Sequence, residues 1–277
     1  MQRREFLQAS IPSCFVVRLN RLFEIRAQAQ SKRTGHSIPD IDIASIKALC
    51  FDVIGTVVDW NTSVIKELKQ IGASKGFDID WPKFITAWRI QYGLAMQRVR
   101  RRDLPWMNSD GLRRMALDTL LSEFKITGLN EDEKDQLNKI WHRLKPWQDS
   151  VTGLMRLRRK YIIAALSDGS LASLVNMSKA AGLDWDCVLS SELVKHYKPD
   201  KEVYLMAVEL LGLKPEQIMM VSAHKYDLQA AKSSGMKTAF LIRPTESGLL
   251  STSEQTPDSS LDLIAKDFSD LANKLGT

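Results

Sequence analysis

Several polar side chains that can do chemistry come at the ends of apolar segments, where strands are expected to finish. Carboxylates can act as nucleophiles or bases, a lysine supplies a fixed charge, and hydroxyls can bind an anion. Because the carboxyl ends of parallel strands meet at one edge of a sheet, these groups are predicted to form one site there. They are Asp52, Thr56, Ser167, Asp168, Lys198, Ser222, His224 and Asp227.

The elements that would carry these residues alternate between strand and helix. The short apolar segment 46–53 is typical of a buried parallel strand. From Tyr161 onward, strands at 161–166, 187–190, 218–221 and 238–242 alternate with helices at 171–181, 200–211, 227–234 and 268–275. Such alternation predicts an α/β fold with a doubly wound, Rossmann-like parallel sheet.

The segment 61–148 interrupts this pattern with helices. Apolar residues recur there at spacings of three and four, in sets that begin at Val64, Phe84, Leu112 and Leu137. We therefore predict an inserted helical cap domain at 61–148 and a core domain at 43–60 and 149–277. Residues 1–42 are predicted to be an N-terminal arm or an export signal.

Composition is that of an ordinary globular protein that can form a large core. The chain has 277 residues, of which 44% are hydrophobic, and a formal net charge of only +6. No nucleic-acid-binding motif accompanies the basic residues, and no segment reaches the roughly 20 apolar residues that span a bilayer. The three cysteines have no metal or redox spacing. We expect no nucleic-acid or membrane partner and no cofactor.

The N-terminus raises a question of localisation. Arg3-Arg4-Glu5-Phe6-Leu7 resembles a twin-arginine export signal, segment 9–17 could be its hydrophobic region, and Ala27-Gln28-Ala29 looks like a signal-peptidase site. Pro12 and the charges that follow fit this poorly. Export to the periplasm and a cytoplasmic protein with an amphipathic or disordered arm both remain open.

The segment Phe51–Asp59 resembles the first motif of the haloacid dehalogenase superfamily. Ser167, Lys198 and Asp227 fall, in order, at its second, third and fourth motifs. One motif alone would be weak, but four in the right order are specific. The resemblance implies that Asp52 is a carboxylate nucleophile at the tip of the first core strand.

Two positions distinguish between reactions within this superfamily. Its phosphatases have a second aspartate two positions after the nucleophile, which protonates the leaving oxygen and helps to bind magnesium. Here that position is Ile54, and Ala223 stands where the fourth motif usually supplies a magnesium ligand. A halide leaves as a stable anion and needs neither group, which favours carbon–halogen cleavage and predicts no metal.

Further positions are similar to those of L-2-haloacid dehalogenases. Trp88-Arg89 resembles the halide-binding pair of that subfamily, Tyr204 follows the lysine by six positions, and Thr56 and Ser222 match active-site hydroxyls. The resemblance implies catalytic roles for Asp52, Thr56, Lys198 and Asp227. It implies substrate or halide contacts for Arg89, Ser167, Asp168, Tyr204, Ser222 and His224.

The predicted reaction converts short (S)-2-haloalkanoic acids to (R)-2-hydroxy acids and halide through a covalent aspartyl ester. The alternatives are a metal-dependent phosphatase of the same superfamily and a non-catalytic member that binds a small carboxylate. A homodimer is one possible assembly. The sequence leaves the halogen and the chain length of the substrate open.

The chain departs from the subfamily at Asp168 and His224, where asparagines are usual. An ionised Asp168 would repel both the halide and the substrate carboxylate. We favour neutralisation by Arg89; protonation in a dry pocket and a changed task for the pocket are the alternatives. For His224, a contact in the active site competes with a surface histidine that caps the following helix.

Overall fold

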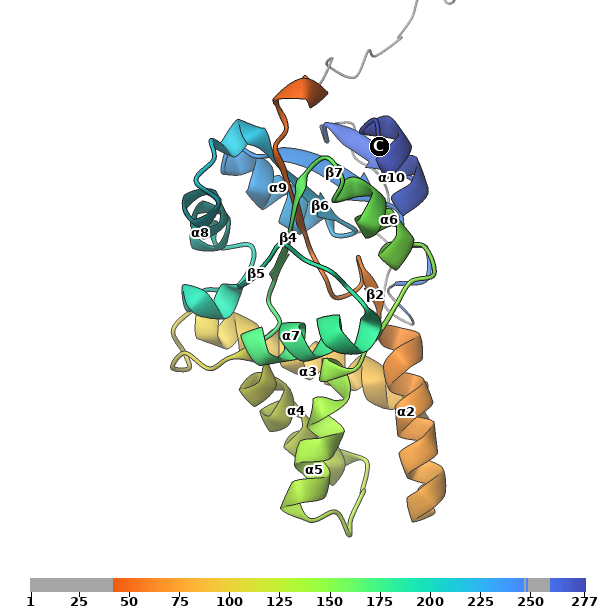
Figure 1. The fold of residues 1–277 in the computed structure, drawn as a ribbon. Coiled ribbons are helices and arrows are strands. Elements are labelled where there is room, and N and C mark those ends of the chain that lie inside the picture. The colour runs from red at the N-terminus through yellow and green to blue at the C-terminus, as the bar shows by residue number, and fades with distance from the viewer. Residues whose placement is uncertain (1–41, 247, 249–259) are drawn as a thin grey trace, which may run out of the picture. The chain divides into compact units, whose positions relative to one another are not determined.

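A six-stranded sheet lies at the centre of the protein in the computed structural model, which describes residues 42–246, 248 and 260–277 (Figure 1). Its strands are β1 (Ala48–Phe51), β4 (Ile162–Ser167), β5 (Cys187–Ser190), β6 (Ile218–Ser222), β7 (Lys237–Leu241) and β8 (Leu263–Ala265). The order is β5-β4-β1-β6-β7-β8, and every neighbouring pair is parallel. The predicted doubly wound core is confirmed.

Helices cover both faces of this sheet, which explains why its central strands are apolar throughout. All four residues of β1 are buried. One face packs against α8 (Lys201–Leu211) and α9 (Lys225–Ser233). The other face packs against α6 (Ser150–Leu157), α7 (Leu171–Ala181) and α10 (Phe268–Lys274).

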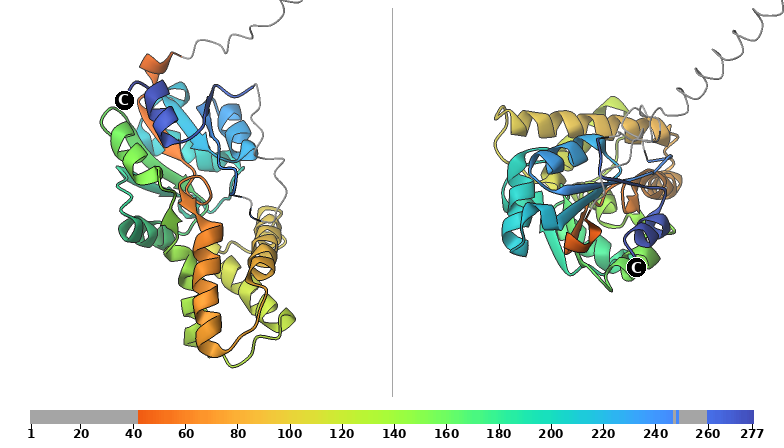
Figure 2. Two further views of the ribbon diagram at one scale, coloured as in Figure 1. Left: turned by 90° about the vertical axis from the view of Figure 1, so that its right-hand side faces the viewer. Right: turned by 90° about the horizontal axis from the view of Figure 1, so that it is seen from above.

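The inserted segment is helical, and Figures 1 and 2 show its helices grouped at one end of the sheet. They are α2 (Trp60–Lys75), α3 (Trp81–Arg100), α4 (Ser109–Glu123) and α5 (Glu131–Asn138). At the start of each helix, the side chain of the N-cap residue accepts a hydrogen bond from a backbone N–H of the first turn. These N-cap residues are Asp59, Asp80, Asn108 and Asn130. The chain passes between core and cap at the antiparallel pair β2 (Val58–Asp59) and β3 (Lys145–Pro146).

The structure adds elements that the sequence did not predict. Helix α6, with eight residues, and the edge strand β8, with three, were not predicted, because assignment from apolar periodicity needs a window of about 11 residues or more. The fourth apolar set begins at the end of α5 and continues into a 3-10 helix at Lys139–His142. Other 3-10 turns lie at Ile43–Ser45, Ser191–Leu193 and Pro215–Gln217. No helix within the described ranges is long and apolar enough to cross a membrane.

Candidate active site

Asp52 follows β1 directly and is 7% exposed. Its Oδ2 accepts a hydrogen bond of 2.8 Å from Thr56 Oγ1, and its Oδ1 lies 3.3 Å from Lys198 Nζ. The chain turns back between Asp52 and Thr56 at Gly55, whose φ of 95° suits glycine. The turn thus brings a hydroxyl from four positions later onto the nucleophile.

Lys198 joins two carboxylates beneath the floor of the site. Its Nζ lies 2.8 Å from Asp227 Oδ2, and Tyr204 donates to the other oxygen of Asp227 at 2.7 Å. Burial alone would lower the pKa of Lys198, but Asp227 and Asp52 outweigh it and raise that pKa. Burial would likewise raise the pKa of Asp52, but the charge of Lys198 and the contact with His224 hold it well below its usual range. Asp52 is therefore a carboxylate at neutral pH.

His224 lies between two carboxylates. Its Nδ1 is 3.2 Å from Asp52 Oδ2, and its Nε2 is 3.2 Å from Glu246 Oε1. Burial would lower the pKa of His224, yet these two partners raise it to about 10. Although His224 is the N-cap residue of α9, its side chain forms no capping hydrogen bond and is buried. The surface-cap alternative for His224 was wrong.

Glu246 is a member of the site that sequence reasoning missed. Glu246 belongs to none of the predicted elements or site residues, but it is 6% exposed, and it accepts a hydrogen bond of 2.9 Å from Trp60 Nε1. A Cβ at Gly55 would collide with its carboxyl group, so Gly55 also makes room for Glu246. No sequence pattern signals this contact, because Trp60 and Glu246 are 186 positions apart.

A cavity of about 170 Å³ opens at Asp52, between core and cap. The cap helix α3 contributes Arg89 and Tyr92, and α4 contributes Arg113. The core side includes Ile54, Ser167, Asp168, His224 and Tyr226. Nucleophile, cations and hydroxyls thus share one small space.

Asp168 is buried at the wall of this cavity, and burial raises its pKa to about 7 against the lowering effect of Lys198. Its Oδ1 accepts the backbone N–H of Lys198 at 3.0 Å. Arg89 does not form an ion pair with Asp168; its guanidinium lies 4.8 Å from the centre of the Trp60 ring. The favoured Arg89–Asp168 pair is thus not formed, and the raised pKa agrees with the protonation alternative.

Three other predicted contacts lie outside the cavity. Ser222 is buried below it, where its Oγ accepts the backbone N–H of His224 at 3.1 Å. Tyr204 donates its hydrogen bond to Asp227. The side chain of Trp88 packs in the cap and donates to the backbone carbonyl of Arg113 at 2.9 Å. Trp88 is therefore not among the residues that line the cavity, whereas its neighbour Arg89 is.

The two positions that argued against phosphoryl transfer have apolar side chains at the site. Ile54 lines the cavity and has no proton to donate. Ala223 offers only its backbone N–H, which donates to Thr56 Oγ1 at 2.9 Å. Within the described residues, no group of three His, Cys, Asp or Glu side chains is placed to hold a metal ion.

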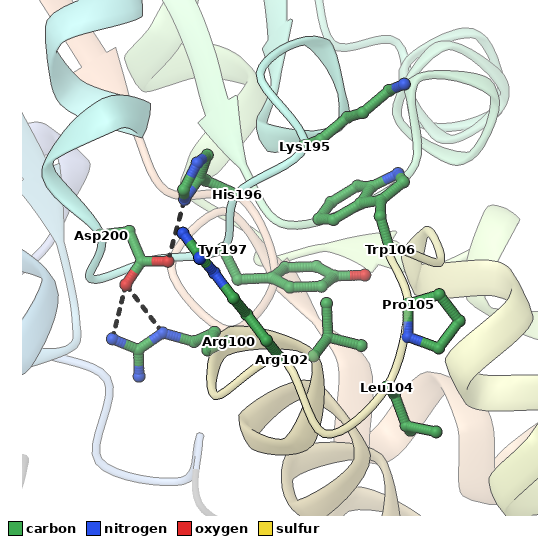
Figure 3. A pocket seen from close by; sticks show the side chains of 10 residues that line it. Arg100, Arg102, Leu104, Pro105, Trp106, Lys195, His196, Tyr197 and Asp200 are labelled. Atoms are coloured by element: carbon green, nitrogen blue, oxygen red, sulfur yellow. Dashed lines mark hydrogen bonds and ion pairs between the residues drawn. The ribbon is translucent and has the colours of Figure 1, made fainter.

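A second cavity, of about 320 Å³, lies behind the loop that carries Lys198 (Figure 3). Arg100 at the end of α3 donates twice to Asp200 Oδ1, at 2.9 and 2.6 Å. Asp200 is the N-cap residue of α8, but its side chain makes this bridge instead of a capping bond. The rings of Trp106 and Tyr197 lie 4.9 Å apart between cap and core. This cavity contains none of the predicted site residues, and its ion pair joins the cap to the Lys198 loop.

Comparison with known proteins agrees with the geometry of the site. A family profile of haloacid dehalogenase-like hydrolases matches residues 46–235. This range includes Asp52, Ser167, Lys198 and Asp227. The chain belongs to the haloacid dehalogenase-like hydrolases, as the four motifs indicated.

Two relatives that are named for their activity are similar to this chain. (S)-2-haloacid dehalogenase 4A of Burkholderia cepacia is 29% identical over 205 residues, which cover 73% of this chain and 85% of that protein. (S)-2-haloacid dehalogenase 1 of a Pseudomonas species is 30% identical over 206 residues, covering 72% and 85%.

Two solved structures are more similar still. A crystal structure of an L-2-haloacid dehalogenase has 40% identity and a TM-score of 0.81, and covers 83% of this chain and 99% of that one. A defluorinating L-2-haloacid dehalogenase has 38% identity and a TM-score of 0.81, with coverage of 84% and 96%. The resemblance to the L-2-haloacid dehalogenase subfamily is confirmed.

Proposed function

We propose that this protein is a 2-haloacid dehalogenase, a hydrolase that acts on carbon–halide bonds. It converts short (S)-2-haloalkanoic acids to (R)-2-hydroxy acids and releases halide. The observation that carries the proposal is an ionised Asp52 in a small cavity with Arg89 beside it and the apolar Ile54 in place of a general acid. Such a site suits a leaving group that departs as an anion.

In the first step, an oxygen of Asp52 attacks C2 from the side opposite the halogen. The new carbon–oxygen bond forms as the carbon–halogen bond breaks, and the bonding pair leaves with the halide. Arg89 lies in the same cavity, where its charge can stabilise that anion. Configuration at C2 inverts, and the product is an ester of Asp52.

In the second step, water attacks the carbonyl carbon of this ester. Lys198 lies 3.3 Å from Asp52 and 2.8 Å from Asp227, and these two residues supply a fixed charge and a base for that attack. The water oxygen stays on Asp52, whereas the original Asp52 oxygen leaves with the 2-hydroxy acid. The ester carbonyl rather than C2 is the target, so the first inversion is preserved in the product.

The decisive experiment measures halide release from L-2-chloropropionate with EDTA present. We expect turnover that survives chelation, and none from Asp52→Asn, which keeps the shape but loses the attacking charge. A single turnover in water labelled with heavy oxygen should place the label in Asp52 rather than in the product. Activity on a phosphomonoester that magnesium restores would establish a phosphatase. Binding of propionate without halide release would establish a non-catalytic member.

A further inference from the structure

Arg113 is a buried cation with two guanidinium nitrogens that form no hydrogen bond. It is 1% exposed and lines the same cavity as Asp52. Its Nε and Nη1 are buried without a hydrogen-bond partner, and its ion pair with Asp110 Oδ1 is long, at 3.8 Å from Nη1. A buried charge with so weak a partner is costly, so a protein that keeps one at a cavity has a use for it.

Two aromatic rings lie close to this guanidinium. Its central carbon lies 4.9 Å from the centre of the Tyr92 ring and 4.7 Å from that of Trp141. These cation–π contacts leave the N–H groups on Nε and Nη1 able to donate to a ligand. A planar carboxylate matches that arrangement better than a spherical ion does.

Hydrogen bonds connect the start of α4 to the loop of the second motif, and these bonds position Arg113. Ser109 Oγ accepts the backbone N–H of Ser170 at 2.7 Å, and Ser170 Oγ donates to Asp110 Oδ2 at 2.6 Å. Arg113 lies one helical turn beyond Asp110. The cap therefore holds this cation at the cavity that Ser167 and Asp168 also line.

Two arginines in the cavity are available to bind the two anions of the reaction, the substrate carboxylate and the halide. Attack on a 2-haloacid places a substrate carboxylate and a departing halide in the cavity together. Among the described cations that line it, His224 already faces Asp52 and Glu246, which leaves Arg89 and Arg113. Arg113 lies close to two rings and is 1% exposed, whereas Arg89 comes from α3 and lies against a single ring, that of Trp60.

We propose that Arg113 binds the carboxylate of the 2-haloacid and so selects acids as substrates, while Arg89 takes the halide. This inference depends on the proposed dehalogenase function. Arg113 contacts the substrate away from the reacting carbon. Its loss should therefore raise KM for the acid more than it lowers kcat.

The test separates the two anions by using propionate, which has no leaving group, and bromide, which has no carboxylate. We expect Arg113→Gln to weaken propionate binding by about tenfold or more and to leave bromide binding nearly unchanged. Arg89→Gln should do the reverse. Arg114→Gln, on the surface of the same helix, is the matched control and should alter neither.

Normal propionate affinity in Arg113→Gln would overturn the proposal and leave Arg113 a structural cation beside two rings. Equal loss of both anions would overturn it too. If Arg113→Gln does not fold, Arg113→Lys keeps the charge but loses the planar fork, and we expect it to bind propionate more weakly than the wild type. If the wild-type protein releases no halide at all, the proposed function fails, while the propionate titrations still test Arg113.

Discussion

Asp168 and His224 place ionisable groups where the resembling enzymes usually have asparagines, and their surroundings give them opposite behaviour. Asp168 is buried among groups that stabilise its charge too weakly, so its pKa rises to about 7. His224 has a carboxylate at each ring nitrogen, so it keeps its proton up to about pH 10. At neutral pH the cavity therefore has a stable imidazolium and a carboxyl group that changes charge.

The first prediction concerns Asp168. Below about pH 7 its carboxyl group is neutral; above it, the anion repels the substrate carboxylate. We expect kcat/KM for L-2-chloropropionate to fall by about tenfold or more as pH rises through this range. Asp168→Asn still offers an acceptor to the Lys198 N–H and should abolish that fall. A pH profile of halide release measures it, with exposed Asp103→Asn as the control. If kcat/KM of Asp168→Asn still falls over this pH range, the fall is caused by the ionisation of another group.

The second prediction concerns Glu246. Removing its charge with Glu246→Gln takes away one of the two partners that raise the pKa of His224. Because a histidine loses its proton as pH rises through its pKa, the alkaline limb of kcat/KM should move down by about one to two pH units. Exposed Glu216→Gln should leave the limb in place. An unmoved limb in Glu246→Gln would show that the charge on His224 does not support the reaction.

At the scale of elements, the cap is joined to the core beside both the second and the third motif. Ser109 at the start of α4 contacts the loop after β4, and Arg100 at the end of α3 contacts the loop before α8. The second joint is partly exposed, with side-chain exposures of 32% and 21%, so we expect it to contribute no more than about 1 kcal/mol. The buried hydrogen bond of Ser109 should contribute more to the free energy of unfolding.

The third prediction tests that buried joint. Ser109→Ala leaves the buried N–H of Ser170 without an acceptor, which should lower the free energy of unfolding by about 1–3 kcal/mol. KM for the haloacid should rise as well, because α4 carries Arg113. Denaturant titration and steady-state kinetics measure the two effects. The exposed Ser74→Ala is the control. Unchanged stability in Ser109→Ala would mean that water replaces the hydroxyl.

At the scale of the whole molecule, the chain forms the core from two separated segments and crosses to the cap at β2 and β3. Residues from both parts line the cavity, so neither part makes the site alone. A homodimer remains a prediction that sedimentation of the purified protein would test. The N-terminal segment 1–41, in which the export signal or arm is predicted, lies outside the described residues.

The fourth prediction concerns that segment. We propose that Arg3-Arg4 is part of a twin-arginine signal that directs the protein to the periplasm. Cell fractionation should then find the protein there, shortened near Ala29, and Arg3→Lys combined with Arg4→Lys should retain it in the cytoplasm. If the unmodified protein is found in the cytoplasm with its first 30 residues intact, the segment is an N-terminal arm and not an export signal.

The sequence by itself determined most of the order of strands and helices, apart from α6 and β8, and the polar residues expected at one edge of the sheet. Both depend on local properties: apolar period, turn residues, and the rule that parallel strands present their ends at one edge. Asp52, Thr56, Lys198 and Asp227 were found this way, and the structure brings them into one hydrogen-bonded network.

Only the tertiary structure decided what surrounds that network. Glu246 reaches His224 from the far end of the chain, Arg113 enters the cavity from the cap, and Trp88 is not among its lining residues. Arg89 lies on Trp60 instead of pairing with Asp168. These outcomes depend on contacts between distant segments and on how much water each charge loses. Burial and the distance to charged partners determine whether a group is ionised, and neither can be inferred from the adjacent residues in the sequence.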